Sequence, residues 1–264
     1  SALRTLAKAR RQWIALGLTE ALNYSLLAPA LLRTFGMDGP EVIRLPNALS
    51  EEYSALRPSL LPQLIATLGH NRFHQVQEGA VFEVGRVFWR ETNHRYREET
   101  RMAVALMGAI GRPLLDRRRL PSAEECWRWL KGLLEHWFAA MGVTAWGVKD
   151  APHPAFQMGQ SFCIEVDGEP AGVAGIVRRQ IAAEWRIYEP IAAAELTPAV
   201  CLRHRKTAAA PTPPPLFPAT RRDVAMVVDV SVKNEDILRI IRAAAPPELE
   251  SVELFDIFTG GGVP

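Results

Sequence analysis

The sequence has few of the residues and patterns that build disulfide-bonded, zinc-bound or membrane-embedded proteins. Its three cysteines, Cys126, Cys163 and Cys201, are odd in number and form no C-x-x-C pair, which excludes a disulfide framework and a cysteine zinc site. No stretch reaches the roughly 18 uninterrupted apolar residues of a membrane span, and no apolar segment of a signal peptide follows the basic start. We therefore predict buried, reduced thiols and a soluble, cytoplasmic protein with no membrane partner.

An excess of one charge sign is also missing. The 31 Lys and Arg residues face 29 Asp and Glu residues, so the formal net charge of the 264 residues is +2. This balance excludes a strongly basic nucleic-acid-binding tail, and any contact with RNA would depend on local patches. The hydrophobic share of 48% and the charged share of 23% are ordinary for a globular protein. The length suits one large domain or two modest ones.

Motifs of the common nucleotide-binding and hydrolytic sites are absent. The sequence contains no phosphate-binding loop, dinucleotide fingerprint, H-E-x-x-H zinc helix or G-x-S-x-G elbow. Gly260–Gly262 is typical of a plain turn, His70 and His74 of a solvated surface pair, and His153 of a loop histidine with a structural hydrogen bond. We therefore predict no catalytic residue and no metal site.

Helical and strand patterns alternate irregularly, which predicts an α+β protein with a largely antiparallel sheet and helices packed on it. Ser122 and Glu125 form a capping box before a helix that ends at Gly142. Asp167-Gly168 is typical of a tight hairpin turn. Helices are also predicted near residues 3–14, 29–35 and 60–68, and strands at Val42–Leu45, Val81–Trp89, Arg101–Ala109, Phe162–Val166 and Ala171–Val177.

A proline-rich run divides the chain. Residues 207–218 contain AAAPTPPPLFP, which predicts a semi-rigid linker between a core domain at 1–206 and a module at 219–264. The module reads as a strand at Arg222–Asp229, a helix capped by Asn234 and a strand at Leu249–Phe258. We expect Ile237, Leu238, Ile240 and Ile241 to face inward. Such a β-α-β unit is short for an independent core and looks truncated.

One segment resembles a known family motif. GAVFEVGRVFWRE at 79–91 is similar to the motif-2 strand of class II aminoacyl-tRNA synthetases, which runs F-E-I-G and ends in F-R-x-E. In that family the arginine directly after the phenylalanine reaches the ATP α-phosphate. Here Trp89 follows Phe88, and Arg90 is displaced by one residue, which on a strand turns it to the opposite face. The resemblance therefore implies a synthetase-like sheet that has lost its ATP contact.

Further segments resemble the β subunits of bacterial phenylalanyl-tRNA synthetases, in the order of that family and over nearly the whole chain. The resemblance implies a non-catalytic class II synthetase-like domain followed by the start of a ferredoxin-like anticodon-binding domain, as a C-terminal piece of a longer subunit. The segments are RRQWIALGLTEALNYSLL, LPNALSEEYSALRPSLLPQLIATLGHN, PHPAFQMGQSFCIEVDGEPAGVAGIV, AAAEL, FPATRRDVAMVVD and VELFDIFTGGGVP.

The same resemblance implies partners. The chain would act as a scaffold that packs on an α subunit within an (αβ)2 assembly and that contacts tRNA, while the whole enzyme uses ATP and magnesium and this piece binds neither. Basic clusters flank the linker, and Arg offers a planar fork suited to phosphate. Trp129, on a different helix face from Trp127 and Trp137, and Arg57 are the candidates for the partner interface. The candidates for contact with tRNA are Arg203, Arg205, Lys206, Arg221 and Arg222.

Two other readings stay open. The chain would be a self-sufficient ATP-dependent ligase if Arg86 or Arg90 took up the phosphate, because both lie on the strand face of Phe88. Alternatively it would be an interaction module that binds only protein, in which case affinity for tRNA would not show the steep salt dependence of phosphate contacts.

Overall fold

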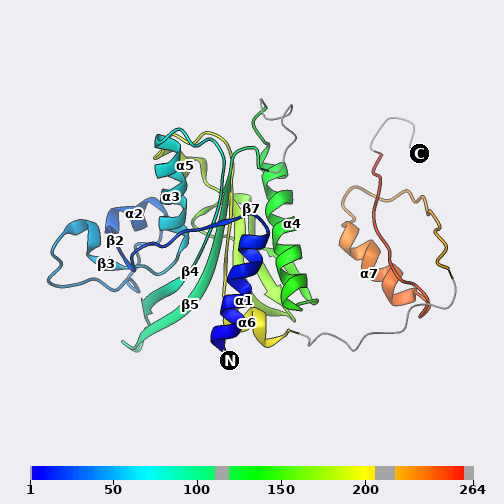
Figure 1. Cartoon of the computed structure of the whole chain (residues 1–264), viewed down its shortest axis with the longest axis horizontal. Coiled ribbons are helices and arrows are strands. Elements are labelled where there is room, and N and C mark those ends of the chain that lie inside the picture. The colour runs from blue at the N-terminus through cyan, green and yellow to red at the C-terminus, as the bar shows by residue number, and fades with distance from the viewer. Residues whose placement is uncertain (1, 111–118, 206–217, 259–264) are drawn as a thin grey trace. The chain divides into compact units, whose positions relative to one another are not determined.

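The computed structural model describes residues 2–110, 119–205 and 218–258 (Figure 1). The chain divides into two compact units, Ser1–Ala210 and Pro211–Pro264, which are described separately below. Residues 207–217 of the predicted linker, Lys206 and Gly260–Gly262 lie outside the described residues. Within the described ranges, no helix combines the length and the apolar character needed to cross a membrane.

A seven-stranded sheet forms the centre of the first unit, in the order β1-β4-β5-β9-β8-β7-β6. Only its pairing of β1 with β4 is parallel among the described strands, so the prediction of a largely antiparallel sheet is confirmed. A separate two-stranded sheet pairs β2 with β3. The strands are β1 Thr19–Glu20, β2 Leu26–Leu27, β3 Ala55–Leu56, β4 Gly79–Arg90, β5 Tyr96–Met107, β6 Trp146–Asp150, β7 Phe156–Val166, β8 Glu169–Val177 and β9 Ile191–Leu196.

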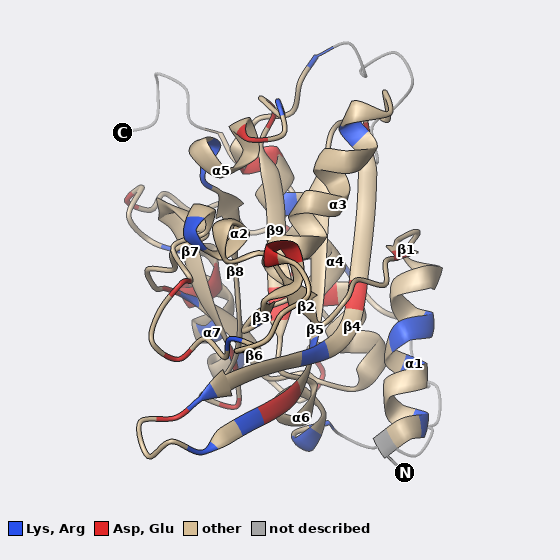
Figure 2. Cartoon of the chain, turned by 90° about the vertical axis from the view of Figure 1, so that its left-hand side faces the viewer, with Lys and Arg blue, Asp and Glu red and all other residues tan. Residues whose placement is uncertain are grey.

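Helices cover both faces of the sheet (Figures 1 and 2). One face of the sheet packs on α1, α4 and α6 and is called the α1/α4 face. The other face packs on α3, α5 and the end of α2 and is called the α3 face. Strand β5 feeds both cores by alternation, with Val104 in the first and Ala105 in the second. The helices of this unit are α1 Ala2–Ala15, α2 Pro29–Thr34, α3 Leu61–Phe73, α4 Ala123–Met141, α5 Arg179–Ala183 and α6 Pro198–Arg203, with a 3-10 turn η1 at Glu51–Tyr53.

Local signals placed both ends of α4 and the tight hairpin correctly. Ser122 and Glu125 form both hydrogen bonds of the capping box at the start of α4, and Gly142 ends this helix in the left-handed conformation with φ 80°. Between β7 and β8, Asp167 and Gly168 have φ angles of 51° and 79°, which is the backbone of a two-residue hairpin turn. A local capping hydrogen-bond pair and positive-φ positions therefore fixed these boundaries.

Burial confirms the thiol prediction in part. Cys126 and Cys201 are buried, while Cys163 is only half-buried, and none of the three forms a disulfide. Burial raises the pKa of the Cys201 thiol to about 12, so this side chain is protonated and unreactive at neutral pH.

Three predicted strands are wrong. Around Val42–Leu45 the chain forms only an isolated bridge from Arg44 to Ala55, because a strand needs a partner along its length. In the second unit, residues 222–229 and 249–258 form no strand, although their apolar runs favoured one. A strand without a neighbour leaves its backbone groups unpaired, so pattern alone does not secure it.

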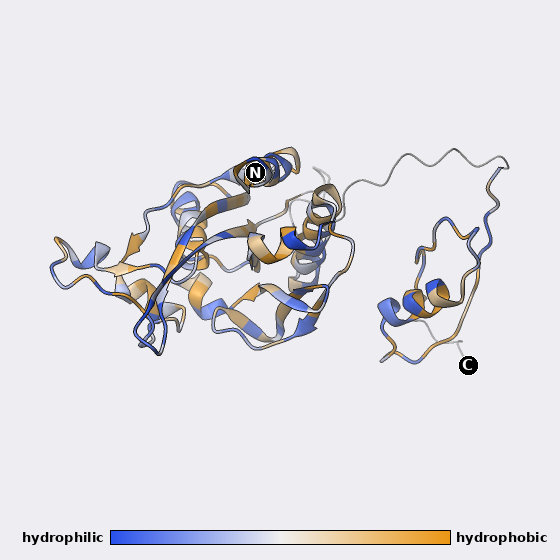
Figure 3. Cartoon of the chain, turned by 90° about the horizontal axis from the view of Figure 1, so that it is seen from below, coloured by the Kyte–Doolittle hydropathy of each residue, from blue (hydrophilic) through white to orange (hydrophobic). Residues whose placement is uncertain are grey.

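Helix α7, Asn234–Ala244, is the helix predicted for the second unit. Its N-cap is Lys233, without a side-chain cap, and not Asn234. Hydrophilic and hydrophobic residues alternate along it (Figure 3). Ile237, Leu238 and Ile241 are half-buried as expected, but Ile240 is 63% exposed, which contradicts its inward placement. The described part of this unit contains no buried residue to pack against.

Candidate functional site

The synthetase-like hairpin is formed by β4 and β5, which pair without a break from Gly79 opposite Met107 to Arg90 opposite Tyr96. Because side chains alternate along a strand, Trp89 shares the α3 face with Glu83, whereas Arg86, Phe88 and Arg90 share the opposite face. Trp89 thus stands on the face and at the position, directly after Phe88, where the resemblance expects an arginine. Arg101 of β5 lies over its ring, with Cζ 5.9 Å from the ring centroid.

Arg86 and Arg90 are exposed and have partners of their own. Arg86 forms an ion pair with Glu98, and Arg90 Nη2 donates a hydrogen bond of 2.9 Å to the Pro40 carbonyl oxygen. Their separation from the α3 face agrees with the predicted displacement of Arg90.

A buried ion pair occupies the same face of the sheet as Trp89. Arg57 Nη1 lies 2.7 Å from Glu83 Oε1, and the two side chains are 3% and 0% exposed. Arg57 also donates to the Arg86 carbonyl oxygen at 2.9 Å and to Gln63 Oε1 at 3.1 Å, while Asn23 Nδ2 donates to Glu83 Oε2 at 2.7 Å. Such a network offsets the cost of removing both charges from water. It also shows that the prediction of Arg57 as a partner contact is wrong, since its guanidinium is used inside the chain.

Gly85 of β4 leaves the space that the Arg57 guanidinium occupies beside the strand. A Cβ atom at this position would lie 2.3 Å from Arg57 Nη2. The glycine of the F-E-V-G run is therefore required by the buried arginine, independently of any ligand.

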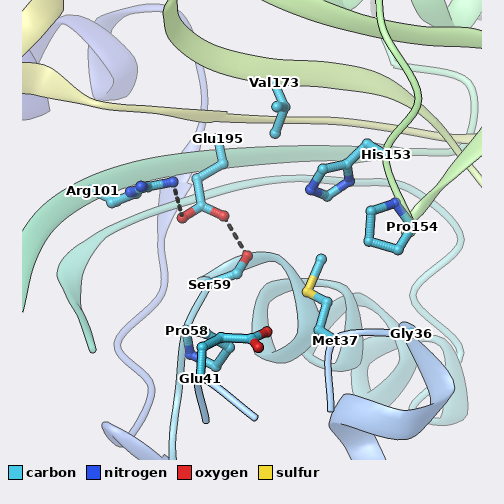
Figure 4. Close-up of a pocket in the computed structure, with 10 residues that line it drawn as sticks. All are labelled: Gly36, Met37, Glu41, Pro58, Ser59, Arg101, His153, Pro154, Val173 and Glu195. Atoms are coloured by element: carbon cyan, nitrogen blue, oxygen red, sulfur yellow. Dashed lines mark hydrogen bonds and ion pairs between the residues drawn. The ribbon is translucent and has the colours of Figure 1, made fainter. Parts of the chain in front are cut away.

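On the same face, a cavity of about 250 Å³ lies between the sheet, which carries Glu195 and Val173, and the segments that carry Ser59 and Met37 (Figure 4). Glu195 of β9 is 2% exposed and forms part of the wall. Ser59 donates its hydroxyl to Glu195 Oε2, and Arg101 Nη1 lies 3.7 Å from Oε1. Arg101 is shared, because its Nη2 is also 3.0 Å from Glu99.

Burial sets the protonation of Glu195. It raises the pKa of this carboxyl, because the charged form loses its hydration. The positive charge of Arg101, the Ser59 hydroxyl and the backbone amide of Leu60 oppose that rise. The groups around Glu195 therefore offset only part of the hydration that its charged carboxylate loses on burial.

His153, in the loop before β7, faces the same cavity (Figure 4). Its pKa is lowered to about 4, first by burial and then by the positive charges of Arg178 and Arg101. The Ala155 amide donates to Nδ1 at 3.3 Å, so in the neutral ring the hydrogen is on Nε2. The predicted role of a loop histidine with a structural hydrogen bond is confirmed.

The residues of the α3 face do not fit a nucleotide or its magnesium ion. A triphosphate needs cations that are free to bind it, but Arg57 and Arg101 are held by carboxylates and Trp89 replaces the expected arginine. Across the described ranges, no three His, Cys, Asp or Glu side chains are grouped so that they could hold a metal ion.

Of the candidates for RNA contact, Arg203 and Arg205 lie together at the end of α6, and both are exposed. Arg203 Nη1 is 3.0 Å from Glu169, and Arg205 Nη1 donates to Thr5 Oγ1 at 3.2 Å. The charge of Arg203 is thus partly neutralised within the chain.

The other RNA candidates fall elsewhere. Arg221 and Arg222 are exposed in an irregular segment of the second unit, and Lys206 lies outside the described residues. The structure therefore describes Arg203 and Arg205 in the first unit and Arg221 and Arg222 in the second.

The remaining interface candidate, Trp129, lies on α4. Its side chain is half-buried and packs against the core of the α1/α4 face. The neighbouring Trp127 stacks on Phe162 with ring centroids 4.3 Å apart. Trp127 and Trp129 are thus both half-buried, whereas Trp137 is fully buried in the core.

Sequence reasoning missed Ser59, Arg101 and Glu195. A signal did exist for one of them, since Glu195 is the lone charge in the otherwise apolar strand IAAAEL. A charged residue in a fully buried strand needs partners, which marks it as part of a site or a network.

Two family models match the chain. Residues 1–197 match the phenylalanyl tRNA synthetase beta chain CLM domain, and residues 215–264 match the ferredoxin-fold anticodon binding domain. The second match identifies the module at the C-terminal end, and together with the sheet described above it confirms the predicted fold class.

Similar curated proteins carry the name phenylalanine–tRNA ligase beta subunit. That of Symbiobacterium thermophilum is 32% identical over 257 residues, covering 96% of this chain and 28% of its own length. That of Vibrio cholerae is 31% identical over 265 residues, with shares of 98% and 32%. The chain therefore spans less than a third of the length of these relatives.

A solved structure shares the fold. PylSc of Desulfitobacterium hafniense, a pyrrolysyl tRNA synthetase, matches with a TM-score of 0.58 at 15% identity, covering 74% of this chain and 66% of that one. At this identity the match shows a class II synthetase fold and nothing about activity. With a family model over residues 1–197, the predicted resemblance is confirmed, and this chain belongs to the phenylalanyl-tRNA synthetase β-chain family.

Proposed function

We propose that this chain is the non-catalytic scaffold and tRNA-contact portion of a phenylalanine–tRNA ligase β subunit. The whole enzyme, with an α subunit in an (αβ)2 assembly, would attach phenylalanine to its tRNA in the cytoplasm using ATP and magnesium. The observation that carries the proposal is the α3 face, where Trp89 and two carboxylate-bound arginines stand in place of free phosphate-binding cations.

The charges on the α3 face support a structural role, because its arginines already neutralise carboxylates of the chain. An ATP molecule brings several negative charges, and each needs a guanidinium, ammonium or metal partner once water is removed. Releasing Arg57 for that purpose would leave Glu83 buried without its cation, at a cost of about 3–5 kcal/mol. Stabilising the sheet and binding ATP are therefore competing uses of the same side chain.

The tRNA role rests on the ferredoxin-fold anticodon binding model over residues 215–264. We propose that Arg221 and Arg222 contact phosphates, with Arg205, Lys206 and Arg203 as contacts from the other side of the linker. Arg203 contributes least, because Glu169 already holds its guanidinium. Each phosphate contact would add sequence-independent affinity that falls as salt rises.

The α subunit would contact the first unit. We propose Trp129 as one anchor, because a half-exposed tryptophan supplies a large apolar surface at an interface. Replacing Trp129 by alanine should weaken assembly with the α subunit, while Arg128→Ala on the same helix, whose side chain is exposed and paired with Glu124, should not.

Pyrophosphate exchange tests the non-catalytic claim. The chain alone, given phenylalanine, ATP and magnesium, should produce no exchange above the blank. Exchange that disappears in the Arg86→Ala, Arg90→Ala double variant would overturn the proposal and establish the self-sufficient ligase instead.

Salt dependence tests the tRNA claim. Affinity for tRNA should fall steeply between low and physiological salt, and the Arg221→Ala, Arg222→Ala double variant should lower the salt slope by about 2, near 1 for each lost contact. Arg128→Ala serves as the control, since it removes one positive charge from a residue that is not proposed to contact tRNA, and it should leave the slope unchanged. An unchanged slope in the double variant would favour a module that binds only protein.

A further inference from the structure

One atom in the cavity above the sheet lacks the partner that its burial demands. Glu195 is 2% exposed, and its Oε1 accepts no hydrogen bond of normal geometry from any described residue. The nearest cation is Arg101, whose Nη1 is 3.7 Å away, beyond hydrogen-bond distance, and whose other Nη is closer to Glu99. A buried carboxylate oxygen in this state costs free energy until a donor reaches it.

The cavity itself has room for that donor. Its volume of about 250 Å³ lies just below the roughly 300 Å³ at which pockets for drug-sized ligands begin, so it suits a smaller molecule. Glu195 and His153 approach it from the sheet side and Met37 from the opposite side (Figure 4). Val173 and Met37 supply apolar wall for a short hydrocarbon body.

The charged side chains that line the cavity favour a ligand of positive charge. Two carboxylates, Glu195 inside and the exposed Glu41, face a single guanidinium, Arg101, which Glu99 also holds. His153 is neutral at physiological pH and adds no positive charge. A cationic donor would therefore be attracted to the cavity, and an anion would meet an unfavourable field.

We propose that this cavity binds a small primary ammonium compound, with the ammonium group donating to Glu195 Oε1 and a short apolar body against Met37 and Val173. The ligand would complete the hydrogen bonding of the buried carboxylate. This site differs from a nucleotide site, because it uses a carboxylate acceptor where phosphate recognition needs cations. The proposal does not rest on the proposed function, and it would hold whether or not the chain assembles with an α subunit.

Titration of the full chain with n-butylamine tests the proposal, with n-butanol as a neutral molecule of the same shape. Amide NMR signals of Ser59, Val173 and Glu195 should shift with n-butylamine and saturate. Because a hydrogen bond to a charged group contributes about twice as much as a neutral one, n-butanol should bind about tenfold more weakly.

Two variants locate the binding. Glu195→Gln keeps the size and the acceptor for Ser59 but removes the charge, and it should weaken n-butylamine binding about tenfold. Glu41→Gln, at an exposed position, should weaken it only about twofold by the loss of a long-range charge, and it serves as the second variant if Glu195→Gln does not fold. Glu135→Gln on α4, outside the cavity, should bind as the unchanged chain does.

The outcomes decide the proposal in either direction. Equal binding of n-butylamine and n-butanol, undiminished amine binding by a folded Glu195→Gln variant, or no saturable shift at all would overturn it, and the last result would leave water as the occupant. If Glu195→Gln does not fold, an unchanged affinity in Glu41→Gln would also overturn it. A pyrophosphate exchange activity, by contrast, would overturn the proposed function and leave this site untouched.

Discussion

The two units of the chain bury their apolar residues to very different extents. In the first unit, Trp13, Phe82 and Trp137 are fully buried between the sheet and its helices. In the second unit, Phe255 and Phe258 are 71% and 72% exposed, and no described residue is buried. Both contain amphipathic segments, so the difference teaches that an apolar pattern produces a core only where a second layer covers it.

The largest expected effect is the loss of a core tryptophan from the first unit. Trp137 stacks on Trp13 at 5.1 Å and donates to the Ala9 carbonyl oxygen at 3.2 Å. Trp137→Ala should lower the free energy of unfolding by about 3–5 kcal/mol, because it removes that packing and leaves a cavity. Urea denaturation followed by circular dichroism measures it, and a loss below about 1 kcal/mol would contradict the burial described here.

A comparison of the buried Arg57–Glu83 ion pair with an exposed ion pair tests the effect of burial on charged residues. Arg57→Ala should destabilise the first unit by about 3 kcal/mol, because Glu83 stays buried without its cation. The double variant Arg57→Met, Glu83→Met should be less destabilised than this single change, since it buries no charge. Arg128→Ala, which breaks the exposed pair with Glu124, should cost less than about 0.5 kcal/mol in the same urea experiment.

A pH profile probes the burial of His153. Its pKa is about 4 in the folded chain against an ordinary 6.5, so between these values the unfolded state binds more protons. The free energy of unfolding should therefore rise with pH across this window, by up to about 3 kcal/mol at 1.36 kcal/mol per pKa unit. The stabilisation that comes from the neutral His153 is fully present above pH 6.5, and it is lost as the pH falls toward 4.

The histidine contribution is read as a difference between variants. Glu195, whose pKa is raised, adds the opposite slope above its ordinary value of 4.5, because the folded state then holds the extra proton. His153→Gln should flatten the rise, whereas His94→Gln, at an exposed turn between β4 and β5, should leave it unchanged. A His153→Gln profile parallel to that of the unchanged chain would show that His153 titrates normally.

The smallest expected effect belongs to the second unit. Ile240→Ala on α7 removes a side chain that is already 63% exposed, so it should change the free energy of unfolding by less than about 0.5 kcal/mol. Hydrogen exchange of the α7 amides measures this local stability. A loss of several-fold protection would mean that Ile240 is covered in solution, which would remove the contrast between the units.

Sequence by itself determined the local features. The capping box at Ser122 and the hairpin turn at Asp167-Gly168 followed from contacts within a few residues. The motif-2 likeness at 79–91, together with the further similar segments along the chain, also identified the family, because such a resemblance depends on residue identity alone.

Only the tertiary structure decided which residues share the candidate site. Ser59 and Glu195 are 136 positions apart, and Arg57 lies 26 positions from Glu83, so no local pattern marks them as partners. The structure likewise showed that residues 222–229 and 249–258 form no strand, since β pairing requires a neighbour that a periodic pattern does not supply. Which residues are buried and which side chains pair depends on how the layers pack. That packing places Arg57 in the core, paired with Glu83, and not on the surface.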